Sequence, residues 1–272
     1  MTLPCLLPLS LAVLSAVLVS VPGFARPTAK GMPSALVGTW DVVQVAVDLA
    51  DQPHWLYSPD DPRLLGRELV VTSNGLHLND DSFDCQDARW TSMEGRLSAL
   101  LGKRFRRGPA MGRARTPTLK ELGLGKVDPR AADPRVMGFT PTCPPPAEGR
   151  SSDWNDDGFY AVGPDRLLLA QDATVILVLE RRRTAATPKT SFACARAQSP
   201  SEHALCQSFS LAGYDRSVAA AYRHALKTAD SEAAEALQKE QAAWLAQRDA
   251  CKADAACLEK TMRERVNALM QE

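Results

Sequence analysis

Four cysteines in the last part of the chain place the strongest constraint on its fold. Cys194, Cys206, Cys251 and Cys257 lie within a run of amphipathic helical patterns. A short helical unit buries little apolar surface, and cross-links are a common source of stability for such units outside the cytosol. The pattern therefore predicts a disulfide-bonded helical unit in an exported protein.

Residues 1–25 are predicted to be a signal peptide. The segment 6–24 is almost wholly apolar, and the small residues Gly23 and Ala25 suit a cleavage site after Ala25. Pro22 interrupts the apolar run, which argues against a permanent membrane span of about 20 residues. We expect a periplasmic or secreted protein without a stable membrane anchor after cleavage.

Removal of this segment leaves six of the seven cysteines, and no Cys-x-x-Cys pair is present. Disulfides are the expected outcome in an oxidising compartment. Cys85 and Cys143 are predicted to pair because they are the only two cysteines before the helical patterns. The four later cysteines allow three pairings. We favour Cys194 with Cys206 and Cys251 with Cys257, which close short loops, although pairing between helices would close longer loops and stabilise more.

Charge and motifs exclude several functions. Lysine plus arginine equals aspartate plus glutamate at 32 each, so no overall field favours nucleic acid. The sequence has no HExxH motif, no G-x-S-x-G elbow and no phosphate loop. We therefore expect a binding protein without a cofactor rather than an enzyme.

The composition predicts an α+β protein of two domains. Residues 34–183 carry short β-like apolar runs, residues 184–190 form a polar linker, and residues 191–272 show helical spacing. Strands are expected near residues 40–47, 68–72, 76–78, 159–162, 166–170 and 174–180, with an Asn74-Gly75 turn closing one hairpin. These strands favour an antiparallel barrel or sandwich. The Gly38-Thr39-Trp40 opening and the arginines after the last strand resemble a lipocalin-type barrel, in which a late arginine covers an early tryptophan.

Residues 103–135 form a basic segment without sustained periodicity. One interpretation is a long solvated loop whose base a Cys85–Cys143 bond would tie. The other is a contact patch for an anionic partner, such as envelope polymers or lipid headgroups. The patch would be built from Arg104, Arg106, Arg107, Arg113 and Arg115.

One calcium-like pattern follows this segment. Asp153, Asn155, Asp157 and Gly158 reproduce the opening of a calcium-binding loop, D-x-N-x-D-G. Pro164 occupies the position of the bidentate glutamate, so an acidic turn without metal is the favoured interpretation.

The helical region begins with a capping box. Ser199 and Glu202 can exchange hydrogen bonds across the first turn, with Pro200 at the first helical position. Ser210 is predicted to cap a second helix, residues 231–250 a third, and residues 257–269 mark a fourth.

The residues of this region resemble the lysozyme inhibitor LprI-like family over about 80 of the 272 positions. The resemblance is carried by the four cysteines and by a set of spaced motif residues that includes Glu202, Asp215, Tyr222, Trp244, Arg248 and Asp249. Tyr214 stands where leucine is usual in the family, and Ala242 where arginine is usual. The resemblance implies an exported helical protein with disulfides, and lysozyme as its partner.

We interpret the motif residues as structural. Tyr222 and Trp244 have the spacing of core residues, and Asp215 is predicted to form an ion pair with Arg248 between helices. The favoured function is lysozyme inhibition by occlusion of the lysozyme cleft. The alternative is a protein that binds a small ligand or an envelope polymer through the β domain. An internal apolar cavity would favour that alternative, and a filled barrel would argue against it.

Overall fold

The computed structural model describes residues 26–49, 56–80, 84–105, 117–128, 131–144, 154–155, 157–171 and 174–271, without the side chains of residues 26–30. The predicted signal peptide lies outside these residues. The strands are β1 (Arg26–Lys30), β2 (Gly38–Val47), β3 (Glu68–Val71), β4 (Gly75–Leu78), β5 (Cys85–Gln86), β6 (Arg89–Arg96), β7 (Arg135–Thr142), β8 (Gly158–Ala161), β9 (Arg166–Gln171) and β10 (Val175–Arg181). The helices are α1 (Leu97–Arg104), the 3₁₀ helix η3 (Cys194–Arg196), α2 (Pro200–Gln207), α3 (Phe209–Thr228), α4 (Ser231–Ala250) and α5 (Ala255–Leu269).

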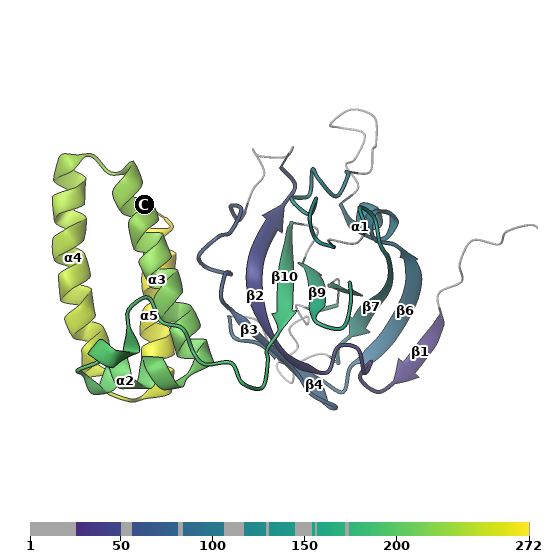
Figure 1. Ribbon diagram of the computed structural model, residues 1–272, viewed down its shortest axis with the longest axis horizontal. Helices are drawn as coiled ribbons and strands as arrows, with labels where there is room; N and C mark the ends of the chain where they lie inside the picture. Colours follow the sequence, from purple (N-terminus) through teal and green to yellow (C-terminus); the bar gives the residue numbers. More distant parts are fainter. Residues whose placement is uncertain are drawn as a thin grey trace, which may run out of the picture.

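The strands form one antiparallel sheet of ten strands in the order β1-β6-β7-β8-β9-β10-β2-β3-β4-β5. Only residues 87–88 separate β5, at one end of this order, from β6, near the other end. So short a connection spans at most about 10 Å, and the sheet must therefore curl back on itself. Figure 1 shows this curled sheet beside the helices. The Cys85–Cys143 disulfide, with 5.6 Å between its Cα atoms, joins β5 to the residue after β7.

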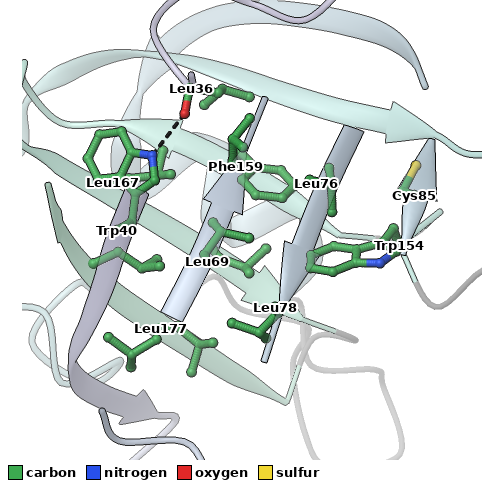
Figure 2. Close-up of a cluster of buried hydrophobic side chains, with 14 of the residues drawn as sticks. Leu36, Trp40, Leu69, Leu76, Leu78, Cys85, Trp154, Phe159, Leu167 and Leu177 are labelled. Atoms are coloured by element: carbon green, nitrogen blue, oxygen red, sulfur yellow. Dashed lines mark hydrogen bonds between the residues drawn. The ribbon is translucent and has the colours of Figure 1, made fainter. Parts of the chain in front are cut away.

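Buried side chains fill the inside of the curled sheet. Trp40, Trp154 and Phe159 occupy the centre with leucines from β3, β4, β9 and β10 (Figure 2). The Trp40 indole donates to the Leu36 carbonyl oxygen at 2.8 Å. The Arg181 guanidinium carbon lies 4.0 Å from the centroid of the Trp40 ring, which is the arrangement of early tryptophan and late arginine expected from the sequence.

A second apolar cluster covers the outer face of the sheet. Its members come from β2, β7, β8, β9, β10, helix α1 with the residue that follows it, and the segment 117–128: Ala46, Leu97, Leu100, Leu101, Phe105, Leu119, Leu122, Leu124, Val127, Val136, Tyr160, Leu168, Ala170, Ile176 and Val178. Because β9 and β10 are buried on both faces, they are apolar almost without interruption.

This cluster corrects the interpretation of residues 103–135 as a solvated loop, since described parts of that segment are buried on the sheet. It also corrects the role given to Arg104. The Arg104 guanidinium donates to the Tyr160 hydroxyl at 3.0 Å and to the Asp157 carbonyl oxygen at 2.8 Å, so it joins α1 to β8. Arg106, Arg107, Arg113 and Arg115 lie outside the described residues.

The β3–β4 hairpin is present, but its turn differs from the prediction. Thr72 and Gly75 pair across the turn, which places Ser73 and Asn74 at its centre. Gly75 does not have a positive φ angle. Its lack of a side chain matters because a Cβ there would collide with Gln86 and with the Cys85 carbonyl oxygen. Gly75 thus allows β5 to approach β4.

Strands β6 and β7 were not expected from the sequence. Trp90 is the only buried residue of β6, and neither strand has a strong apolar period. Pairing with each other along the full length of both strands satisfies their backbone groups. Long-range pairing therefore decides their structure.

The four predicted helices are present. Ser208, and not Ser210, caps α3 by accepting from the Leu211 amide at 3.2 Å. Among the described residues, no helix combines the length and apolar character needed to cross a membrane.

Candidate functional site

Helices α2 to α5 share one apolar core. Its buried members are Leu205, Leu211, Tyr214, Val218, Ala221, Ala225, Leu237, Trp244, Leu258, Met262, Val266 and Leu269. Trp244 is buried, and Tyr222 is partly buried against the same cluster. Both aromatic motif residues thus lie where their spacing placed them, in or against the core.

Two disulfides connect neighbouring elements of this helical region. Cys194 pairs with Cys206 and joins η3 to α2, whereas Cys251 pairs with Cys257 and joins the end of α4 to the start of α5. These are the pairings favoured from the sequence. Each bond closes a loop of few residues, so neither ties α3 directly to α4.

The motif residue Asp249 connects α2 to α4. Its carboxylate accepts from the Ser201 hydroxyl and, at 2.8 Å, from the Arg248 guanidinium. Burial alone would raise the pKa of Asp249, but these hydrogen bonds outweigh it and lower the pKa. Glu202 accepts from the backbone amides of Gln198 and Ser199, which lowers the pKa of Glu202 and completes the predicted capping box.

The predicted ion pair between Asp215 and Arg248 is not formed. Arg248 is buried and pairs with Asp249, its neighbour in the chain. Asp215 accepts instead from the Ser191 backbone amide at 2.5 Å. The reason is the direction of α3: its Asp215 side faces the segment that enters the helical region, whereas Arg248 faces α2 with Asp249.

The described residues of the calcium-like pattern supply few oxygen ligands for a metal ion. Asp153 lies outside the described residues, and the Asn155 side-chain oxygen accepts from the Cys143 backbone amide at 2.8 Å. No cluster of three or more metal-binding His, Cys, Asp or Glu side chains occurs in the part of the chain that the structure describes.

One face of α3 lies against the sheet, a contact that we call the seam. The Tyr214 hydroxyl donates to the Asn79 carbonyl oxygen at 2.6 Å, and the Ser217 hydroxyl donates to the Leu65 carbonyl oxygen at 3.0 Å. Gly213 lies between them in the chain, and a Cβ there would collide with the Gly66 carbonyl oxygen. The seam is thus made by small and polar residues at close range.

A fully buried arginine lies within the seam. The Arg67 guanidinium carbon is 3.4 Å from the centroid of the Tyr214 ring, and its Nη2 donates to the Ser217 hydroxyl at 2.6 Å. Burial lowers the pKa of Arg67, because the charged form loses hydration. Sequence reasoning did not single out Arg67, Tyr214 or Ser217 as a group, since they come together only when α3 packs on β3.

These features define an α+β protein in which a disulfide-bonded helical region lies against a filled, curled sheet. Residues 194–269 of the chain match the family model of the lysozyme inhibitor LprI, and the matched residues are those of η3 and α2–α5. Neither a curated protein nor a solved structure matches the chain.

Proposed function

We propose that the protein is an exported lysozyme inhibitor that occludes the substrate cleft of lysozyme. The observation that carries this proposal is the match of residues 194–269 to the LprI family model. The three disulfides suit an oxidising, extracytoplasmic compartment. Occlusion would keep substrate away from the two carboxylates with which lysozyme cleaves glycosidic bonds. We further propose that the sheet and the helices are separate domains joined by residues 184–190.

The exposed flank of α4 beside its buried face is our choice for the contact surface. The sheet covers one face of α3, whereas α4 has only three buried residues, Leu237, Trp244 and Arg248. Among the described large apolar side chains of α4, only Leu245 is exposed, at 38%. An exposed apolar residue beside neutral surface suits the centre of a protein interface.

An inhibition assay with purified chicken lysozyme and a soluble glycan substrate tests the proposal. The full chain at micromolar excess is expected to raise the apparent KM with little change in kcat, as occlusion requires. Leu245→Glu should weaken inhibition by about tenfold, a typical effect at an interface centre. Val43→Glu is the matched control, because Val43 is 44% exposed on β2. A lack of inhibition by the unmodified chain would contradict the function, and equal inhibition by both variants would contradict the surface.

The alternative of a ligand inside the β part has less support. The inside of the curled sheet is occupied by Trp40, Trp154, Phe159 and the surrounding leucines (Figure 2). A filled interior provides no internal apolar cavity for a small ligand at this place.

A further inference from the structure

A cleft of about 450 Å³ opens where the seam ends, between α5 and one end of the curled sheet. Hydrogen bonds bridge the seam at Ser210. The Ser210 hydroxyl accepts from the Asn79 side-chain amide at 2.8 Å and donates to the Glu259 carboxylate at 3.1 Å. One turn beyond Glu259, Arg263 of α5 lines the cleft. A volume of several hundred Å³ between two packed parts of a protein is typical of small-ligand sites.

One wall of the cleft is a polar stripe on α5. Arg263 and Asn267 lie four residues apart on one side of the helix, and Gln271 continues the stripe just past the helix end at Leu269. Met262, Val266 and Leu269 are buried in the helical core and hold α5 in place. The polar stripe is thus separate from the apolar face of α5.

The opposite wall is held in place by a buried carboxylate. Asp61 is fully buried and accepts from Arg63 Nη2 at 2.8 Å and Nε at 2.9 Å. Arg63 also donates to the Leu56 carbonyl oxygen, and its guanidinium carbon lies 4.7 Å from the centroid of the Tyr57 ring. Leu56, Tyr57 and Arg63 therefore present a preformed surface to the cleft, and Leu56 is 63% exposed there.

The remaining lining residues determine the chemistry of the cleft. Leu64, Val175 and Tyr214 are buried and give it an apolar base. The charged lining residues are Arg63, which Asp61 already neutralises, together with Arg263, Asp80 and Asp157. Amides and a hydroxyl complete the lining, from Gln171, Thr174, Asn267 and Gln271.

This combination points away from anions and from purely apolar ligands. With Asp61 counted, the charged groups at the cleft leave a small negative excess, which disfavours an anionic ligand. Amide side chains both donate and accept hydrogen bonds, as the hydroxyl groups of a ligand do. We propose that the cleft binds an uncharged oligosaccharide, with its hydroxyl groups on the polar stripe of α5 and a sugar face on the Leu56–Tyr57 wall. This proposal does not rest on lysozyme inhibition.

Calorimetric titration of the full chain, without lysozyme, tests it. The probes are the N-acetylglucosamine trisaccharide and maltotriose, and at least one should bind with a Kd below about 1 mM. The combined substitutions Asn267→Ala and Gln271→Ala should weaken that binding by about tenfold. The matched control combines Gln238→Ala and Gln247→Ala, which remove two exposed amides from α4 and should leave the Kd unchanged.

Each other outcome overturns the proposal. It fails if neither trisaccharide binds at concentrations up to about 10 mM. It also fails if the α5 and α4 variants bind equally well, or if trilysine or triglutamate binds more tightly than both sugars. Circular dichroism of each variant shows whether the fold is retained, and Asn267→Gln with Gln271→Asn provides a milder pair if the alanine variant is unfolded. Loss of sugar binding with intact lysozyme inhibition would separate the two functions.

Discussion

At the scale of single residues, buried charges decide how the loops around the sheet are held. Asp61 accepts from the backbone amides of Ser58 and Arg63 as well as from the Arg63 side chain. Arg182 likewise pairs with Asp41 and Glu68, and so links the end of β10 to β2 and β3. In the sequence Asp61 is one of two adjacent acids in a turn, and only the structure shows that it organises one.

Asp61→Asn is expected to destabilise the protein. Burial would raise the pKa of Asp61, but hydrogen bonds from Arg63 and Ser58 outweigh it and lower the pKa below its ordinary value of 3.8. The ionised Asp61 side chain therefore stabilises the folded protein fully above the ordinary pKa of an aspartate. This stabilisation is lost as the pH falls through the lower pKa that Asp61 has in the folded protein. We expect a loss of about 2–3 kcal/mol at neutral pH, measured by urea unfolding.

The difference between this variant and the unmodified protein should narrow as the pH falls below 3.8. Asp165→Asn is the control, because the Asp165 side chain is 80% exposed and its carboxylate lies 3.8 Å from Arg181. Its effect should be about 0.5 kcal/mol or less. An Asp61→Asn loss that does not change with pH would contradict the role of the charge.

At the scale of elements, α3 packs against both the helical core and the sheet. Leu211, Val218 and Ala221 face the helical core, whereas Gly213 and Ser217 face the sheet. A glycine inside a helix ordinarily lowers its stability by about 1 kcal/mol relative to alanine. Close contact with the Gly66 carbonyl oxygen explains why glycine occupies position 213.

Gly213→Ala is therefore expected to lower stability despite its higher helix propensity. The added Cβ would meet backbone, which cannot rotate away, and overpacking of this kind costs about 1–3 kcal/mol. Urea unfolding measures the net change. An increase in the unfolding midpoint would mean that α3 shifts freely and that the seam is not tightly packed.

At the scale of the whole molecule, the sheet and the helices meet through polar groups. Tyr214, which stands where the LprI-like pattern usually has leucine, contributes its ring to Arg67 and its hydroxyl to Asn79. Arg182 adds a contact to the Phe209 ring at 3.9 Å from its centroid. Such directional contacts define one relative orientation, which in turn shapes the cleft beside α5.

Tyr214→Phe should weaken this junction by removing one buried hydrogen bond. The Asn79 carbonyl oxygen would lose its donor, at a cost of about 1–2 kcal/mol in the free energy of unfolding. Tyr222→Phe is the matched control two turns along the same helix, because Tyr222 packs at the edge of the helical core. Equal stability of the two variants in urea would contradict the importance of the Tyr214 hydroxyl.

Features encoded by near neighbours were predictable from the sequence. Helices α2 to α5, the capping box and the short-range disulfide pairs depend on residues a few positions apart, so periodicity and spacing reveal them. The hairpins of β3–β4 and β8–β10 follow for the same reason. Strand β6, the covering of the sheet by residues 117–128 and the hydrogen bond between Ser201 and Asp249 were not predictable, because each depends on which surfaces meet.

By itself the sequence thus determined the fold class, the cysteine pairs that it favoured and the resemblance of residues 191–269 to one family. Only the tertiary structure decided that the sheet curls around a filled interior, that α3 docks on β3 through Tyr214 and Arg67, and that a polar cleft opens beside α5. The physical reason is sequence distance: Arg67 and Ser217 lie 150 residues apart. Their contact forms only when two independently patterned regions pack together.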